Sequence, residues 1–88
     1  MTLKIERQST KRGTTLRLIG RLRLEHLEGL KEEIKGTNGQ VGLDLEDVTL
    51  VDVDVVRFLG ICESGGMEVL HCSPYIRQWI AREQQTNG

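Results

Sequence analysis

Three things are scarce in this chain: cysteine, an excess of charge of one sign, and any long apolar run. Two cysteines in 88 residues are too few for a disulfide framework. Twelve basic and thirteen acidic residues give a net charge of −1, so we expect no nucleic-acid partner, because binding phosphates needs a basic surface. No apolar run approaches the roughly 20 residues that span a bilayer, and residues 1–9 mix charge with alternating apolar residues, unlike a signal peptide. We therefore predict a cytoplasmic protein that does not insert into membranes.

The length favours one small domain, which we place at residues 1–83, with a frayed tail at residues 84–88. A chain of this size buries roughly 60% of the surface that its unfolded form exposes. Little core is left to line a deep active site. A binding module fits this limit better than an enzyme does.

The two cysteines are expected to be ordinary buried thiols. A metal site would have to combine Cys62, Cys72, His71 and His26, whose spacing is irregular and which belong to three different elements. His71 and Cys72 could form a base and a nucleophile, but neighbours in a strand point to opposite faces of the sheet. We expect no metal site here.

The first part of the chain predicts a hairpin followed by a helix. Leu3 and Ile5 alternate with polar residues, and after a polar turn Leu16 and Leu18 resume the alternation, which is typical of two half-buried antiparallel strands. Gly20 interrupts that pattern. Apolar residues at three- and four-residue spacing then predict a helix with one buried stripe: Leu24, Leu27, Leu30 and Ile34.

The second strand-to-helix transition is predicted at Asp52. Alternation from Val41 predicts a strand parallel to the preceding one, but a strand that continued to Val56 would have sixteen residues, against a usual three to ten or so. Asp52 is a good helix N-cap, and Asp54 would lie in the first turn, near the positive end of the helix dipole. We therefore start the helix at about Val53.

The last segments predict a strand and a helix. Gly65-Gly66 closes the preceding helix, Met67 to Cys72 is typical of a short buried strand, and Ser73-Pro74 opens a helix in which Trp79 is a core anchor. The predicted fold is α/β, with a small mixed sheet, packed helices and the order β-β-α-β-α-β-α. The first hairpin is antiparallel and the later βαβ units are parallel.

This order, together with four short motifs, resembles the STAS family of anti-sigma factor antagonists over nearly the whole chain. The motifs are Gly20-Arg21-Leu22, the strand from Val41 to Leu45, Val51-Asp52-Val53-Asp54, and the stretch from Gly66 to Ser73-Pro74. The resemblance implies a bacterial signalling protein of transcription regulation without catalytic activity. Such a protein binds an anti-sigma factor that is also a serine kinase, and phosphorylation of one serine ends the binding.

The chain departs from the family at that serine. The family reads Asp, Ser, Ser or Thr, Gly at the start of the second helix, where this chain has Asp52, Val53, Asp54 and Val55, so Asp54 occupies the switch position. As an imitation of phosphoserine, Asp54 would supply one negative charge instead of about 1.5 to 2. Alternatively the switch is lost, and Asp54 is a first-turn carboxylate or pairs with a basic residue of a partner. Val55 in place of glycine would add a branched side chain where a partner could approach.

We favour an interaction module that is not switched by phosphorylation at this position. Its expected partner-binding residues are Arg21, Arg23, Asp52, Val53, Asp54 and Arg57, provided that the loop after Gly20 lies beside the second helix as in the family. The expected partner is an anti-sigma factor serine kinase or a related signalling protein. The alternatives are the ATPase subunit of a bacterial ABC-type lipid transporter, or a stress-signalling scaffold.

An enzyme would have to use the acidic residues Asp44, Glu46, Asp47, Asp52 and Asp54, which suit a magnesium-dependent phosphoacceptor. Such a site also needs a lysine on a later strand end, and no lysine follows Lys35. Neither a Walker-type loop nor a GxGxxG motif is present. We therefore expect no catalytic residues and no cofactor.

Overall fold

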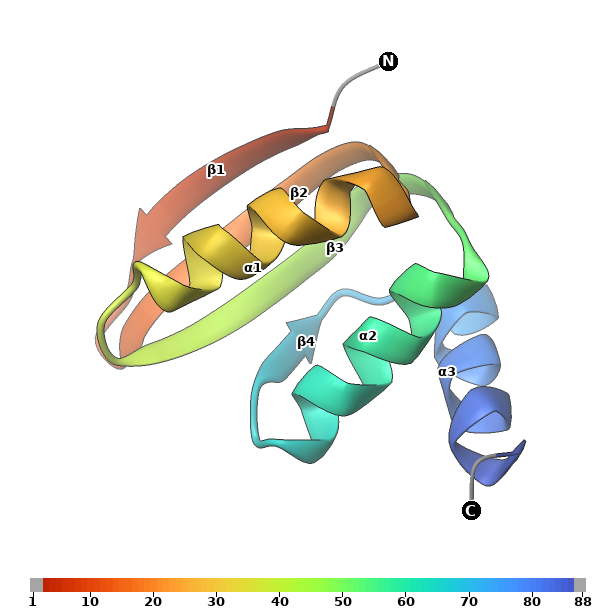
Figure 1. Ribbon diagram of the computed structural model, residues 1–88. Coiled ribbons are helices and arrows are strands. Elements are labelled where there is room, and N and C mark those ends of the chain that lie inside the picture. The colour runs from red at the N-terminus through yellow and green to blue at the C-terminus, as the bar shows by residue number, and fades with distance from the viewer. Residues whose placement is uncertain (1–2, 87–88) are drawn as a thin grey trace.

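The computed structural model describes residues 3–86 and shows a four-stranded sheet packed with three α-helices (Figure 1). Along the chain the elements are β1 (Lys4–Ser9), β2 (Gly13–Leu22), the short 3₁₀ helix η1 (Leu24–His26), α1 (Leu27–Lys35), β3 (Gln40–Val51), α2 (Val53–Ser64), β4 (Glu68–Leu70) and α3 (Pro74–Thr86). The strands lie side by side in the order β1-β2-β3-β4, with β1 antiparallel to β2 and the other pairs parallel. The predicted fold class and element order are confirmed.

Two irregularities in the β2–β3 ladder explain why β3 is unusually long. The register moves from Arg17 opposite Asp44 to Ile19 opposite Asp47, and later from Gly20 opposite Val48 to Arg21 opposite Leu50. Each step uses one more residue on β3 than on β2, which is the signature of a β-bulge. Gly20 was expected to interrupt its strand, but β2 continues to Leu22, with Gly20 at φ 109° beside the second bulge.

The core lies between one face of the sheet and the helices, of which α1 and α2 cross the same face in Figure 1. Period-two alternation buries the leucines of β2 and β3, and the helices cover them with apolar residues at three- and four-residue spacing. The fully or almost fully buried side chains include Leu16, Leu18, Leu43 and Leu45 of the sheet, Leu30 of α1, Val55, Val56 and Leu59 of α2, and Ile76 and Ile80 of α3.

The predicted helix boundaries at the glycines and at Ser73 are confirmed. Gly65 is the C-cap of α2, and Gly66 follows at φ 97°. At the start of α3, Ser73 Oγ accepts a hydrogen bond from Ile76 N at 3.3 Å. Trp79 packs against the core as expected but is only partly buried.

Three details differ from expectation. Leu24 lies in η1 before α1 begins, and it is 56% exposed instead of belonging to a buried stripe. The strand predicted from Met67 to Cys72 is only the three residues of β4, half-buried at the sheet edge. The segment expected as a frayed tail begins inside α3, which runs to Thr86, and Gln84 donates a hydrogen bond to the carbonyl of Gly60; residues 87–88 lie outside the described part. None of the helices within residues 3–86 has the length and apolar composition to cross a bilayer.

Candidate functional site

Asp52 joins the start of η1, just after β2, to the start of α2. Its backbone is extended, with φ −115° and ψ 178°, so the chain turns from β3 directly into the helix. One carboxylate oxygen, Oδ1, accepts a hydrogen bond from Val55 N at 3.1 Å, and the other, Oδ2, accepts one from Leu24 N at 2.8 Å. The first contact confirms the predicted N-cap. The second connects two segments that are 28 residues apart in the sequence.

The arginines after Gly20 lie beside this junction. Arg21 is opposite Leu50 and Leu22 is opposite Val51 in the parallel β2–β3 ladder, so the ends of both strands reach the same edge of the sheet. Arg21 and Arg23 are exposed. The expected neighbourhood of the loop after Gly20 and the start of α2 is therefore present.

Asp54 lies in the first turn of α2 and is half-exposed. Within residues 3–86 its carboxylate has no hydrogen-bond or ion-pair partner. Val53 is also half-exposed, whereas Val55 is fully buried. The expectation that Val55 would stand where a partner approaches is wrong, because this position lies on the side of the helix that packs into the core.

Arg57 does not join the other predicted residues through its side chain. Its Nε donates to Glu83 Oε1 of α3 at 3.0 Å. It lines a surface groove between α2 and α3, whose walls also include Gly60, Ile61 and Ile80. Arg57 therefore belongs to the α2–α3 side of the molecule.

Two exposed leucines lie at the junction and were not predicted from the sequence as site residues. Leu24 is 56% and Leu50 is 47% exposed. Leu24 donates the hydrogen bond to Asp52, and Leu50 precedes Asp52 by two residues. Strand alternation could have predicted the exposure of Leu50. Neighbours in a strand point to opposite faces, so if Val51 is buried, Leu50 is exposed. We call this surface the α2 corner and define it as Arg21, Arg23, Leu24, Leu50, Asp52, Val53 and Asp54.

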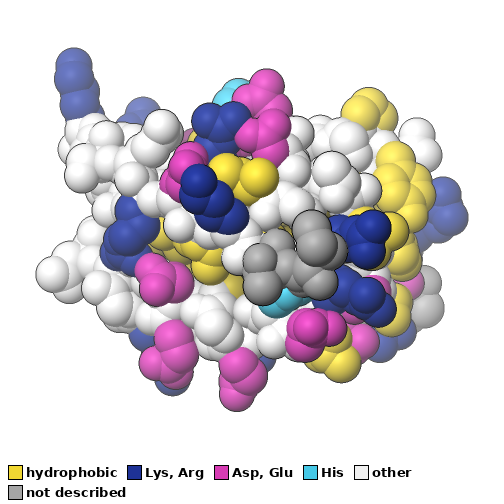
Figure 2. All heavy atoms as spheres, turned by 90° about the horizontal axis from the view of Figure 1, so that it is seen from above, with side chains coloured by type: hydrophobic (Ala, Val, Ile, Leu, Met, Phe, Trp, Pro, Cys, Tyr) yellow, Lys and Arg dark blue, Asp and Glu magenta, His cyan; other side chains and the backbone are white. Residues whose placement is uncertain are grey.

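The composition of the α2 corner is that of a contact surface. Apolar side chains surrounded by charged ones, with arginine prominent, are typical of protein interfaces. Figure 2 shows the molecule from above, with basic side chains next to hydrophobic ones at the right-hand end, where β2 and β3 end in Figure 1.

The five acidic residues considered for catalysis do not form one site. Asp47 accepts hydrogen bonds from Arg17, and Asp44 accepts one from His71. Asp52 follows Asp47 by five residues of mostly extended chain, a span of roughly 15 Å. The carboxylates of β3 and those of the α2 corner are therefore separate groups.

Asp44 and His71 affect each other's ionisation. Partial burial opposes the charged form of Asp44, but hydrogen bonds from Glu46 N and His71 outweigh this effect, and the pKa of Asp44 lies below its usual value. The hydrogen bond to Asp44 and the negative charge of that group raise the pKa of His71.

Among the described residues, neither cysteine belongs to a group of three metal-ligating side chains. Cys62 lies in α2 and Cys72 follows β4; both are free and partly buried, and burial raises the pKa of each thiol. Within residues 3–86, the single group of three potential metal ligands consists of Asp44, Glu46 and His71.

No family model matches this chain, and no curated protein matches its sequence.

Proposed function

We propose that this protein is a non-enzymatic interaction module of the STAS type, which acts in the cytoplasm and binds a signalling partner of the anti-sigma factor kinase class through the α2 corner. The observation that carries the proposal is the contrast between two neighbouring carboxylates. Both oxygens of Asp52 hold the corner together, at 3.1 Å from Val55 N and 2.8 Å from Leu24 N. Asp54, two residues later, has no partner within the described residues.

A fixed corner with an unpaired carboxylate suits binding better than catalysis. Because the backbone around Asp52 is held by hydrogen bonds to two elements, little conformational entropy is lost when a partner docks. Leu24 and Leu50 offer apolar contact area, and the arginines and Asp54 supply the charged surroundings. A basic residue of the partner would pair with Asp54, and such pairs steer association and fix orientation.

Asp54 makes the binding independent of serine phosphorylation at this position. A serine side chain is neutral until a kinase phosphorylates its hydroxyl, whereas an aspartate side chain has no hydroxyl that a serine kinase could phosphorylate. Its charge is also smaller than that of phosphoserine, at one against about 1.5 to 2. We therefore propose that the module binds its partner constitutively.

The test is affinity capture with tagged protein from its native lysate, followed by mass spectrometry. The wild type is compared with Asp54→Ser and Asp54→Ala, and Leu50→Asp is matched with Ile61→Asp. Leu50 is 47% and Ile61 is 72% exposed, so both substitutions place a charge on the surface, but only the first changes the α2 corner.

We expect the wild type to retain a kinase of the anti-sigma type, Leu50→Asp to lose it, and Ile61→Asp to keep it. A partner captured only by the Ser and Ala variants at position 54 would show that Asp54 is a permanent off state, which contradicts constitutive binding. A partner that is lost with Ile61→Asp and kept with Leu50→Asp would show that the α2 corner is the wrong surface. Recovery of a transporter ATPase instead would contradict the proposed partner class.

A further inference from the structure

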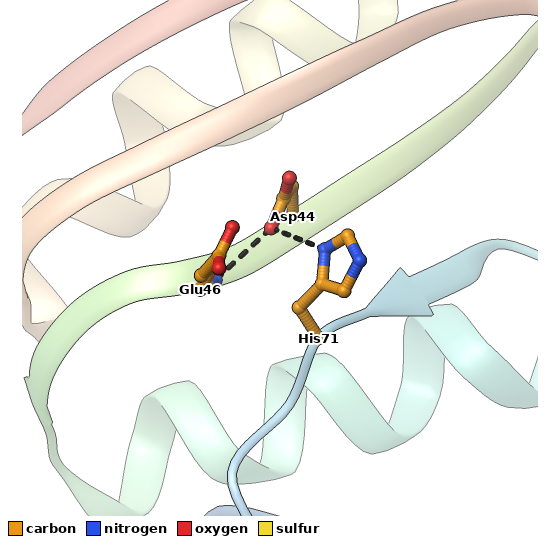
Figure 3. Close-up of side chains that lie close together, drawn as sticks. All are labelled: Asp44, Glu46 and His71. Carbon is orange, nitrogen blue, oxygen red and sulfur yellow. Dashed lines mark hydrogen bonds and ion pairs between the residues drawn. The ribbon is translucent and has the colours of Figure 1, made fainter.

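Three side chains, two from the middle of β3 and one from the residue after β4, converge on the sheet at a distance from the α2 corner (Figure 3). Asp44 and Glu46 belong to β3, and His71 directly follows β4. Each offers one ligand atom, and these atoms all lie within 4.8 Å of one another. The group combines an imidazole nitrogen with two carboxylates, so it is a mixed set of metal donors and more than a patch of acidic residues.

The fold holds Asp44 and His71 close together. Asp44 is opposite Leu70 in the β3–β4 ladder, so the residue after β4 emerges beside it. His71 has φ 54°, and its ring lies against Asp44 with Nδ1 at 3.0 Å from Oδ1. The Asp44 side chain is only 13% exposed, and its Oδ1 also accepts a hydrogen bond from Glu46 N at 3.0 Å. Asp44 is therefore the anchored member of the group.

Glu46, in the bulged stretch of β3, supplies the third donor. Between Asp44 and Asp47 the strand contains one residue more than β2 does, and bulges of this kind redirect side chains. Glu46 lies inside this stretch and is exposed, as is the His71 side chain, at 60%. Both can rotate towards an ion without disturbing the core.

We propose that Asp44, Glu46 and His71 form a binding site for a divalent transition-metal ion, with Zn²⁺ as the best-suited ion. Bonds from zinc to nitrogen and oxygen are about 2.0 to 2.2 Å long, so two ligands of a tetrahedral site are roughly 3.3 to 3.6 Å apart. The two atoms His71 Nδ1 and Asp44 Oδ1 are 3.0 Å apart, so they need to separate only slightly to bind one ion. The ion takes the place of the proton between these two atoms, and Glu46 closes the third position. Water fills the remaining coordination position.

The donor set and the local charge favour zinc over magnesium and calcium. Magnesium and calcium prefer oxygen ligands, whereas imidazole suits zinc, nickel and copper. Two carboxylates balance the charge of a divalent ion. Apart from His71 itself, Arg17 is the basic side chain whose charge acts on Asp44. Its guanidinium is engaged by Asp47, which reduces its repulsion of a cation.

The experiment is isothermal titration of the full chain with Zn²⁺ alone. All proteins carry Cys62→Ser and Cys72→Ser, because thiols bind zinc strongly and would obscure the site. His71→Gln is matched with His26→Gln, and Glu46→Gln with Glu68→Gln. Glu68 is a suitable control because it lies on β4, which pairs with β3, but does not belong to the group of Asp44, Glu46 and His71. The urea midpoint of each variant verifies that it is folded.

We expect one equivalent of Zn²⁺ to bind the cysteine-free protein. His71→Gln and Glu46→Gln should each weaken this binding by about tenfold or more, since removing even an outer-shell partner costs roughly 10- to 100-fold. The two control variants should leave it unchanged. The proposal is overturned if the cysteine-free protein shows no saturable binding, or if the His71 and Glu46 variants bind as tightly as their controls do.

Discussion

Asp52 should be among the most sensitive polar positions of the chain, because a single carboxylate makes two structural hydrogen bonds there. Replacing an N-cap Asp with Ala costs about 0.5 to 2 kcal/mol. The second bond, to Leu24 N at 2.8 Å, adds roughly 1.5 to 3 kcal/mol because the acceptor is charged. We therefore expect Asp52→Ala to reduce the free energy of unfolding by about 2 to 5 kcal/mol, a large share of the stability of a small domain.

Asp52→Ser separates the two contributions. Serine keeps a capping oxygen for Val55 N, but its single, shorter hydroxyl cannot also reach Leu24 N. The serine variant should therefore lose only the second contribution and lie between wild type and Asp52→Ala. Asp54→Asn is the control: it removes a first-turn charge without breaking a hydrogen bond within the described residues, at a cost of about 0.3 to 1 kcal/mol.

Urea unfolding, monitored by circular dichroism, gives the free energy of unfolding of the wild type and of the three variants. The slope of this free energy against urea concentration verifies two-state behaviour. The reasoning is refuted if Asp52→Ala loses no more stability than Asp54→Asn. It is also refuted if the serine variant is as unstable as the alanine variant, because the link to Leu24 would then account for the whole effect and capping for none.

Two further predictions concern the sheet. Gly13→Ala would place its Cβ 2.7 Å from Gln40 N and closer still to the Gln40 carbonyl oxygen, so we expect the free energy of unfolding to fall by about 1 to 3 kcal/mol. Gly42→Ala is the control, because the nearest atom to its Cβ would be 3.6 Å away, and it should unfold at the same or a higher urea concentration. The raised pKa of His71 means that the folded state binds this proton more tightly than the unfolded state does, so its stabilising effect is complete below about pH 6.5 and is lost as pH rises through the folded-state pKa. Asp44→Asn should lower the pKa of His71 in an NMR titration, and an unchanged value would contradict the assigned hydrogen bond.

The features that could be predicted from the sequence are those with local causes. The hairpin follows from the alternation around Ile5 and Leu16, and the start of α2 follows from the capping chemistry of Asp52. In both cases the pattern that predicts the element lies in the residues of that element. Strand order then follows from the succession of strand, helix and strand.

The features that were missed depend on contacts between distant segments. His71 meets Asp44 across 27 residues, and no glycine or proline marks the bulge that contains Glu46. Leu24 has helical spacing, but the 3₁₀ turn that precedes α1 places it outside the buried stripe. At the candidate site, the position of Asp52 was predictable, whereas the exposure of Leu50 depends on the two bulges that set the phase of β3.

The two edge strands of the sheet, β1 and β4, have a consequence for how the protein behaves at high concentration. An open strand edge invites pairing with the edge of another copy, and charged side chains or very short edge strands discourage it. Here β1 carries Lys4, Glu6 and Arg7 along one border, and β4 offers only three residues on the other. Neither border presents a long, flat, apolar template, so the long β2–β3 ladder is enclosed by strands that resist self-association and protect the chain against fibrillar aggregation.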